Sequence, residues 1–256
     1  MADVNALFSL KGKTALITGS GRGIGKAVAQ GFAGAGAKVW VTARNEKNGR
    51  EVAEKVGGPF FRADLRSSED IENLAGEITA REEKLDILVN NAALEVIMPF
   101  EKTDFSVSDE IWRTNVRAAE ELTYLLLPLL KKSSSASIIN ITSIHDMVPY
   151  PNNLDYNMSK AALNMFTKTL AIELGPLGIR VNNLAPGPVE TDLNRDVIEE
   201  IGRSNFAEWV PSGRVAQVEE MIGPAVFLAS EASSFVNGAT LYADGGYMIN
   251  LVRYRP

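Results

Sequence analysis

The sequence of 256 residues contains no cysteine and only one histidine, His145. Disulfide bonds, iron–sulfur clusters and thiolate catalysis are therefore excluded, and the usual sets of zinc ligands cannot be assembled. The same inventory excludes a zinc-dependent alcohol dehydrogenase. We predict that the protein has no metal site.

Basic residues and long apolar runs are also scarce. Lys and Arg total 26 against 32 Asp and Glu, a net charge of -6, which argues against nucleic acid because its binding rests on basic surface. The most apolar run, residues 122–130, is too short to cross a bilayer. The N-terminus lacks a basic leader followed by an apolar stretch. We expect a cytoplasmic protein that binds neither nucleic acid nor membrane.

Apolar segments typical of strands alternate with helical segments along the whole chain. The length suits one large domain, and a hydrophobic content of 45% provides for one core. Strands are expected near residues 14–18, 38–42, 60–62, 85–89, 137–141, 180–184 and 240–242. Strands this apolar are typically covered on both faces. We predict one α/β domain over residues 1–256, a doubly wound parallel (Rossmann) sheet of about seven strands with helices on both faces.

Residues 189–211 differ from the rest of the chain because they are polar, charged and weakly periodic. In open parallel sheets, ligands bind at the carboxyl ends of the strands. A segment that leaves the sixth strand at that edge is placed to cover a bound substrate. We expect a lid here, with a plain surface excursion as the alternative.

The first predicted strand runs into a glycine-rich turn, TGSGRGIG over residues 18–25, and then into a helix. Glycines let the backbone turn tightly and approach a pyrophosphate, whose charge is favoured at a helix N-terminus. A glycine turn alone is weak evidence. Its place between a strand and a helix favours a dinucleotide site.

The end of the second predicted strand indicates which dinucleotide fits. Proteins that use NAD place a carboxylate there for the ribose hydroxyls, and that charge would repel the 2′-phosphate of NADP. This sequence has Ala43 at that place, followed by Arg44, and a guanidinium pairs well with phosphate. Arg22 in the glycine turn is a second candidate for the same phosphate. We predict NADP(H) as the preferred cofactor, with NAD(H) as the alternative.

Tyr156 and Lys160 lie four residues apart in the helix expected over residues 156–174, and hence on one helix face. Tyr156 is the candidate acid and base for hydride transfer at a carbonyl or alcohol carbon. Forming the phenolate at neutral pH costs roughly 4 kcal/mol, and an ammonium about 4 Å away contributes on the order of 4 kcal/mol. We therefore expect Lys160 to lower the pKa of Tyr156. The alternative is an ordinary helix face.

Taken in order, the motifs of this chain resemble those of the short-chain dehydrogenase/reductase family and cover nearly its whole length. The glycine spacing is T-G-x-x-x-G-x-G, and the further family marks are Asn90-Asn91-Ala92-Ala93, Asn115, Ser143, Tyr156-x-x-x-Lys160, Pro186-Gly187 and Asp244-Gly245-Gly246. One departure is Ala93, where the family usually has glycine. The resemblance implies an NADP(H)-dependent oxidoreductase that interconverts a secondary alcohol or hemiacetal and a carbonyl.

The resemblance also implies roles for individual residues. Tyr156 is the acid and base, Ser143 holds the substrate oxygen, and Asn115 supports a chain of water molecules. Lys160 also binds the nicotinamide ribose. Asp64 accepts a hydrogen bond from adenine, or alternatively serves as a turn or cap residue. The expected cofactor contacts are Gly19, Gly21, Arg22, Gly23, Ile24, Gly25, Arg44, Asp64, Leu65, Asn91, Ala92, Tyr156, Lys160, Pro186, Gly187, Val189 and Thr191.

One local likeness is to the glucose 1-dehydrogenase branch of the family. The stretch from Ser143 to Tyr156, with its S-I-H-D start, resembles S-V-H-E…P…P…Y, and residues 90–95 resemble N-N-A-G-L-E. Asp146 replaces the glutamate. His145 and Asp146 at the rim could bond sugar hydroxyls, although a single loop histidine is often structural. We expect a sugar-like substrate contacted by Ser143, His145 and Tyr156.

Two other functions are compatible with parts of the sequence. A 3-oxoacyl-[acyl-carrier-protein] reductase needs a basic patch for its acidic carrier, to which Lys131, Lys132 and Arg180 could contribute. A non-catalytic NADP-binding regulator should lack the serine, the tyrosine or the lysine, all of which are present. The resemblance further suggests a homotetramer built on the helices around residues 111–130 and 156–174 and on the C-terminal strand.

Overall fold

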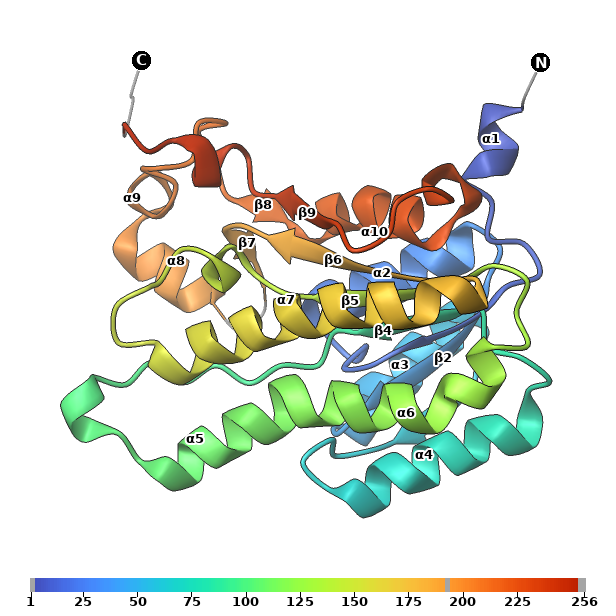
Figure 1. The fold of residues 1–256 in the computed structure, drawn as a ribbon. Helices are drawn as coiled ribbons and strands as arrows, with labels where there is room; N and C mark the ends of the chain where they lie inside the picture. Colours follow the sequence, from blue (N-terminus) through green and yellow to red (C-terminus); the bar gives the residue numbers. More distant parts are fainter. Residues whose placement is uncertain (1–2, 192–193, 253–256) are drawn as a thin grey trace.

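The computed structural model describes residues 3–191 and 194–252, which form a parallel sheet with helices on both faces (Figure 1). The strand order is β3-β2-β1-β4-β5-β6-β9. The strands are β1 (Thr14–Ile17), β2 (Lys38–Ala43), β3 (Phe60–Arg62), β4 (Ile87–Asn90), β5 (Ala136–Ile141), β6 (Ile179–Pro186) and β9 (Thr240–Ala243). The predicted doubly wound sheet is confirmed, and the ends of its seven strands are shifted by at most two residues.

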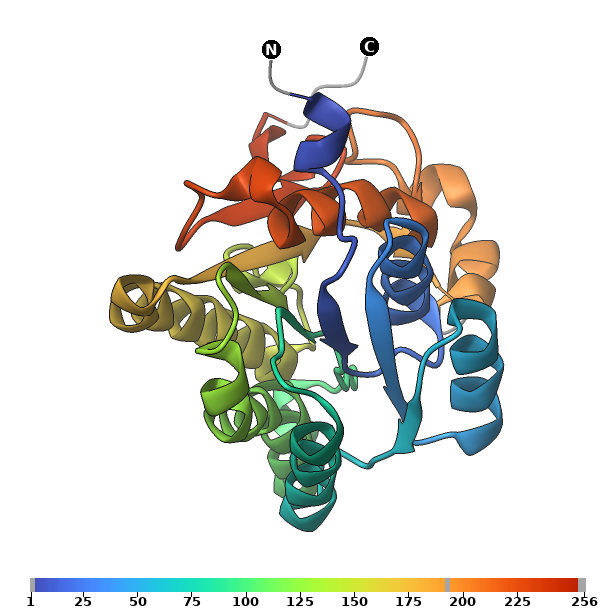
Figure 2. The same cartoon turned by 90° about the vertical axis from the view of Figure 1, so that its right-hand side faces the viewer.

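The longer helices form two layers, one on each face of the sheet (Figure 2). One layer contains α2 (Gly23–Gly34), α3 (Glu46–Val56) and α10 (Ile222–Ala229), and the other contains α4 (Ser68–Arg81), α6 (Ala118–Leu130) and α7 (Leu154–Leu174). The shorter helices are α1 (Val4–Leu7), η1 (Phe100–Lys102), α5 (Phe105–Trp112), η2 (Arg113–Arg117), η3 (Ile144–Asp146), η4 (Gly175–Leu177), η5 (Val218–Met221), η6 (Glu231–Ser233) and η7 (Tyr247–Ile249). No described helix combines the length and apolar character needed to span a lipid bilayer.

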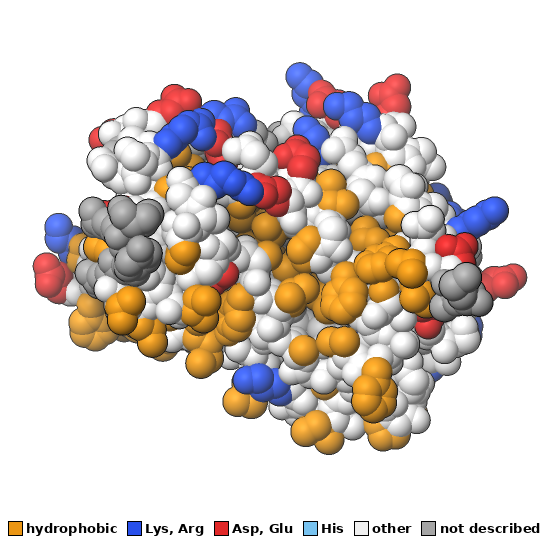
Figure 3. Space-filling model, turned by 90° about the horizontal axis from the view of Figure 1, so that it is seen from above, with side chains coloured by type: hydrophobic (Ala, Val, Ile, Leu, Met, Phe, Trp, Pro, Cys, Tyr) orange, Lys and Arg blue, Asp and Glu red, His pale blue; other side chains and the backbone are white. Residues whose placement is uncertain are grey.

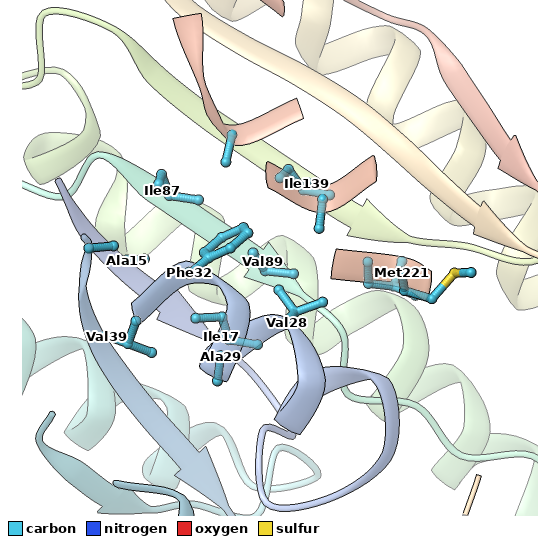
Figure 4. Close-up of a cluster of buried hydrophobic side chains, with 14 of the residues drawn as sticks. Ala15, Ile17, Val28, Ala29, Phe32, Val39, Ile87, Val89, Ile139 and Met221 are labelled. Carbon is cyan, nitrogen blue, oxygen red and sulfur yellow. The ribbon is translucent and has the colours of Figure 1, made fainter. Parts of the chain in front are cut away.

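Side chains of neighbouring residues in one strand point into two hydrophobic cores, one on each face of the sheet. This explains why the strands are apolar throughout. Ile17 packs with Phe32 of α2 and Val89 of β4 on one face (Figure 4). Leu16, next to it in β1, packs on the other face with Leu122 of α6. Side chains alternate between the faces of a strand, so a sheet covered on both sides needs apolar residues at every position.

The site lies between β1 and β4, where the order in which the chain adds strands to the sheet reverses. β1 pairs in parallel with β2 on one side and with β4 on the other. The connections after β1 and β4 therefore diverge and leave a crevice at the carboxyl ends of these strands, which is where parallel sheets of this kind bind ligands. The glycine turn at residues 18–25 lies at this edge.

The segment expected as a lid has more regular structure than its sequence indicates, although positions 192 and 193 lie outside the described residues. β7 (Val189–Glu190) pairs with β8 (Ala216–Gln217), and α8 (Arg195–Ile201) and α9 (Arg203–Phe206) follow β7. Ile198, Ala207 and Val215 form a small separate core. This segment therefore forms its own folded unit beside the carboxyl end of β6.

Candidate active site

The glycine turn is shaped for close approach of a ligand to the backbone. Gly19 and Gly23 have φ angles of 64° and 54°, in the left-handed region that favours glycine. A Cβ atom on Gly25 would lie 2.3 Å from Nδ2 of Asn91, which itself donates to the Thr18 carbonyl at 2.8 Å. The turn is thus fixed against the loop after β4 and has no space for side chains at its tightest points.

A cavity of about 610 Å³ opens beside this turn. Twelve of the expected cofactor residues line it: Gly19, Gly21, Arg22, Gly23, Ile24, Gly25, Arg44, Asp64, Leu65, Asn91, Ala92 and Thr191. Among the described residues the lining also includes Thr42, Asn45, Asn48, Ala63, Arg66, Leu94 and Thr114, which the sequence analysis missed. Asn45 and Asn48 follow Arg44 closely, and this nearness to the predicted phosphate site was the available signal. The hydroxyl oxygens of Thr42 and Thr114 are buried without a protein partner in the described structure. A cavity with a glycine-lined turn and free hydroxyls fits a dinucleotide.

The nucleotide end of the cavity carries positive charge. Ala43 ends β2 where an NAD-binding carboxylate would stand, and Arg44 and Arg22 both line the cavity with exposed side chains. Asp64 has the alternative role of a turn residue, because it accepts from the Arg66 N–H, and both of its carboxylate oxygens also accept hydrogen bonds from the Arg66 side chain. This pairing lowers the pKa of Asp64. An adenine amino group would therefore have to share Asp64 with Arg66.

Asn115 and Ser143 come from different helical segments and approach α7 from two sides. Asn115 is buried in the π-helical turn η2 and donates to the Leu94 carbonyl and to Ser159 of α7, both at 2.9 Å. Such turns often occur at functional sites. Ser143 precedes η3, and its hydrogen bond to Tyr156 only partly opposes the effect of burial, which raises the pKa of this phenol. The structure thus brings Asn115, Ser143, Tyr156 and Lys160 together around the start of α7.

Tyr156 and Lys160 share one helix face, but their charges do not act as expected. The Lys160 amine donates to the Ile141 carbonyl at 2.8 Å and lies 5.4 Å from the Tyr156 ring centroid. Burial lowers the pKa of Lys160 to about 8. Burial and the negative charge of Glu95 raise the pKa of Tyr156 above its ordinary value. The expected lowering of this pKa by Lys160 was wrong for the protein alone, because desolvation and a carboxylate outweigh a buried amine bound to a carbonyl.

His145 and Asp146 are adjacent in sequence but have different surroundings. Nδ1 of His145 lies 2.9 Å from the Val148 carbonyl, and its ring centroid is 6.4 Å from that of Tyr156. Asp146 was expected at the rim, but it is only 6% exposed and accepts hydrogen bonds from Asn164 and Tyr242. The rim expectation was wrong for Asp146 because η3 turns this carboxylate into the interior. The expected role of His145 as a substrate contact stays a prediction.

The segment after β6 contributes less to the cavity than the sequence suggests. Pro186, Gly187 and Val189 are not among the described residues that line it, and neither are Tyr156 and Lys160. Gly187 is needed for packing, because a Cβ atom there would lie 2.6 Å from Cα of Asp244. Thr191 lines the cavity and lies opposite Gly23, so the lid segment reaches the glycine turn.

Comparison with known proteins supports the family indicated by this geometry. A family model described as enoyl-(acyl carrier protein) reductase matches residues 19–248. This match covers most of the chain, including the glycine turn, the Tyr156–Lys160 pair and β9. The chain belongs to the short-chain dehydrogenase/reductase family. The family expectation drawn from the motifs is therefore confirmed.

Individual relatives of this family member match over almost their full length. Glucose 1-dehydrogenase 2 of Bacillus subtilis is 34% identical, covering 93% of this chain and 95% of the relative. The 3-oxoacyl-[acyl-carrier-protein] reductase FabG of Aquifex aeolicus is 33% identical, covering 93% and 98%. The crystal structure of a gluconate 5-dehydrogenase from Burkholderia cenocepacia, in complex with NADP and tartrate, has a TM-score of 0.89 and 34% identity, covering 96% and 99%.

Proposed function

We propose that this protein is an NADP(H)-dependent oxidoreductase that interconverts a secondary alcohol or hemiacetal and a carbonyl. The proposal rests on the convergence of Ser143, Tyr156 and Lys160 beside a glycine-lined cavity. The strand β2 ends at this cavity with Ala43 and is followed by Arg44. Arg44 and Arg22 favour NADP(H), and the NADP complex of the Burkholderia relative supports this choice. NAD(H) remains the alternative cofactor.

Each catalytic side chain has a distinct task in this proposal. When bound, NADP(H) would supply the hydride donor or acceptor, and its oxidised nicotinamide would supply a positive charge. Tyr156 takes the proton from the alcohol in oxidation and returns it to the carbonyl oxygen in reduction. Ser143 holds the substrate oxygen by a hydrogen bond, so that the hydride has a fixed target. Lys160 would hold the nicotinamide ribose, and Asn115, which donates to Leu94 and Ser159, would support a chain of water molecules for proton exchange.

We propose a sugar or a related polyhydroxylated compound as substrate. Ser143 and Tyr156 would hold the reacting oxygen. With Nδ1 of His145 at the Val148 carbonyl, Nε2 of the same ring is left to bond a further hydroxyl. Glucose 1-dehydrogenase 2 among the relatives supports this substrate class. The segment 189–211 is proposed as the lid over it.

The second candidate function is 3-oxoacyl-[acyl-carrier-protein] reduction, which the Aquifex relative favours. The surface gives it little support. Arg180 was a candidate for the basic patch, but its guanidinium donates to the Leu228 carbonyl and to Ser233 within the fold. A non-catalytic regulator is disfavoured because Ser143, Tyr156 and Lys160 are all present and lie close together.

A spectrophotometric panel distinguishes these functions. Reduction of NADP and NAD is followed with glucose, other sugars and polyols, and oxidation of NADPH with a 3-oxoacyl thioester. We expect reduction of NADP by at least one sugar or polyol. A signal with the thioester alone would overturn the substrate proposal, and no signal with any alcohol or carbonyl would overturn the oxidoreductase itself.

We also propose a cytoplasmic homotetramer. Large apolar side chains are exposed on the outward sides of α6 and α7, where Tyr124, Met165 and Ile172 are 76%, 61% and 78% exposed. A second apolar surface lies over α10, β9 and the chain after β9 (Figure 3), and includes Phe235 and Ile249. Two separate apolar faces suit an assembly with two kinds of interface. Light scattering of the purified protein tests the mass, and fractionation of lysed cells tests the location.

A further inference from the structure

Glu95 lies beside the catalytic residues and was not among the predicted site residues. It follows Leu94, whose N–H donates to Asn115 at 2.7 Å and whose carbonyl accepts from the same amide. The Glu95 carboxylate accepts a hydrogen bond from Asn153, the residue just before α7. Glu95 is thus held from both sides, by Asn115 through the backbone and by the start of α7 through its side chain.

The loop that carries Glu95 has a further attachment to the segment before α7. The Met98 N–H donates to the Asn152 carbonyl at 2.6 Å. Asn152 has a φ of 60°, and Asn153 is only 1% exposed. Two contacts, each between residues more than fifty positions apart, therefore hold the loop around Glu95 against the segment before α7. Because these contacts already hold the Glu95 side chain, it loses little further conformational entropy when a substrate binds.

The charge of Glu95 reaches both catalytic groups of α7. It raises the pKa of Tyr156 and opposes the effect of burial on the pKa of Lys160. The other charged or titratable groups around them are Asp146 and His145 from η3 and Asp155, which accepts a hydrogen bond from Ser108 of α5. Glu95 and Asp146 are thus two carboxylates near the Lys160 amine, which is bound to a carbonyl, and Lys168 also acts on Asp146.

We infer that Glu95 selects substrates by charge, so that neutral polyhydroxylated alcohols are accepted and sugar acids are rejected. This inference rests on the proposed function, because it concerns the compound that reacts at Tyr156. The reacting carbon must lie within hydrogen-bond reach of the phenol, so a carboxylate elsewhere on a small substrate is close enough to be repelled by Glu95. The Glu95 side chain is exposed, and like charges a few ångströms apart near a protein surface give about 10- to 100-fold discrimination.

The test is the substitution Glu95→Gln, which removes the charge and keeps an amide oxygen that can accept from Asn153. The matched control is Glu101→Gln, a glutamate on η1 whose side chain is exposed. The ratio of kcat/KM for D-glucose to that for D-gluconate is measured in the wild type and both variants. We expect this ratio to fall about 10- to 100-fold in Glu95→Gln and to stay unchanged in Glu101→Gln. A ratio unchanged in Glu95→Gln, or a wild type that prefers gluconate, would overturn the inference.

Two further readouts separate this inference from the proposed function. In the first, the rise of kcat/KM with pH in alcohol oxidation should move to lower pH in Glu95→Gln, because a negative charge beside the phenol is gone. In the second, calorimetry measures D-gluconate binding to the NADPH complex, in which an alcohol cannot be oxidised. Tighter gluconate binding by Glu95→Gln supports the charge selection even if no alcohol is oxidised. Equal affinity in both proteins, or no binding by either, counts against it.

Discussion

The two halves of the site are built in different ways. In the nucleotide half, Gly19, Gly23 and Gly25 lie in one turn after β1, and Arg44 follows the neighbouring strand β2 at the same sheet edge. The substrate half is assembled from side chains that are far apart in sequence, such as Glu95 with Asn153 and Asn115 with Ser159. The nucleotide half thus combines a local turn with residues at the ends of neighbouring strands, and the substrate half depends on side-chain contacts between distant segments.

This difference indicates where variation changes function. A nucleotide cradle made of backbone has no space for new side chains, since a Cβ on Gly25 would overlap its neighbours. The substrate half can exchange a carboxylate for an amide within the same contacts. We therefore expect substitutions in the first half to change stability and cofactor affinity, and those in the second half to change catalysis and selectivity.

The strongest test of this division is Tyr156→Phe. Loss of the hydroxyl removes the proton donor and acceptor, and kcat should fall by about 10²- to 10⁴-fold or more. NADPH affinity should stay nearly unchanged, because Tyr156 does not line the nucleotide cavity. Turnover is followed by nicotinamide absorbance and NADPH binding by fluorescence. Turnover that persists in this variant would reject the catalytic assignment.

Arg44→Ala tests the nucleotide half alone. A charge-assisted hydrogen bond is worth about 1.5 to 3 kcal/mol, so the Kd for NADP should rise by about 10- to 100-fold. The Kd for NAD, which lacks the 2′-phosphate, serves as the internal control and should change little. Equal losses for both nucleotides would mean that Arg44 does not bind the 2′-phosphate.

Substitutions at two glycines of α2 compare the effect on stability at the tightly packed glycine turn with the effect at a helix position that has open space around it. Gly25→Ala should lower the free energy of unfolding by about 1 to 3 kcal/mol through overpacking, since its Cβ would lie 2.6 Å from the Gly19 carbonyl oxygen. Gly34→Ala meets nothing within 4 Å and should stabilise the protein by about 0.5 to 1 kcal/mol. Denaturant unfolding measures both. Equal effects of the two substitutions would contradict the close packing of the cradle.

The smallest effect is expected from Glu190→Gln in the proposed lid. Glu190 pairs with Arg203 and Arg195, and mainly the Arg203 hydrogen bond lowers the pKa of this carboxylate to about 2. The variant should raise KM a few-fold at neutral pH and leave kcat nearly constant, with faster proteolysis between residues 195 and 206. Unchanged KM and proteolysis would show that this contact does not hold the lid.

The pH dependence of the same contact follows from the lowered pKa. Its stabilising effect is complete above the ordinary pKa of a glutamate, about 4.3, and is lost as the pH falls toward 2. In the wild type, proteolysis of the lid should therefore accelerate over this range. Glu190→Gln should show no such dependence in this segment.

The fold was predictable because it follows from local patterns. Apolar runs of strand length, alternating with helices, specify a parallel sheet covered on both faces, and the seven strands lie close to their predicted positions. The lid was less predictable. Its small core of Ile198, Ala207 and Val215 joins three residues with no common period, and such packing has no signature in a short window of sequence.

The sequence by itself determined the sheet, the glycine cradle, the arginine after β2 and the shared helix face of Tyr156 and Lys160. These features depend on residues a few positions apart, whose geometry is set by the backbone. Only the tertiary structure decided that Glu95 acts on Tyr156, that Asp146 points inward and that Lys160 binds the Ile141 carbonyl. Burial and electrostatics depend on distances between segments far apart in the chain, and no local pattern records those distances.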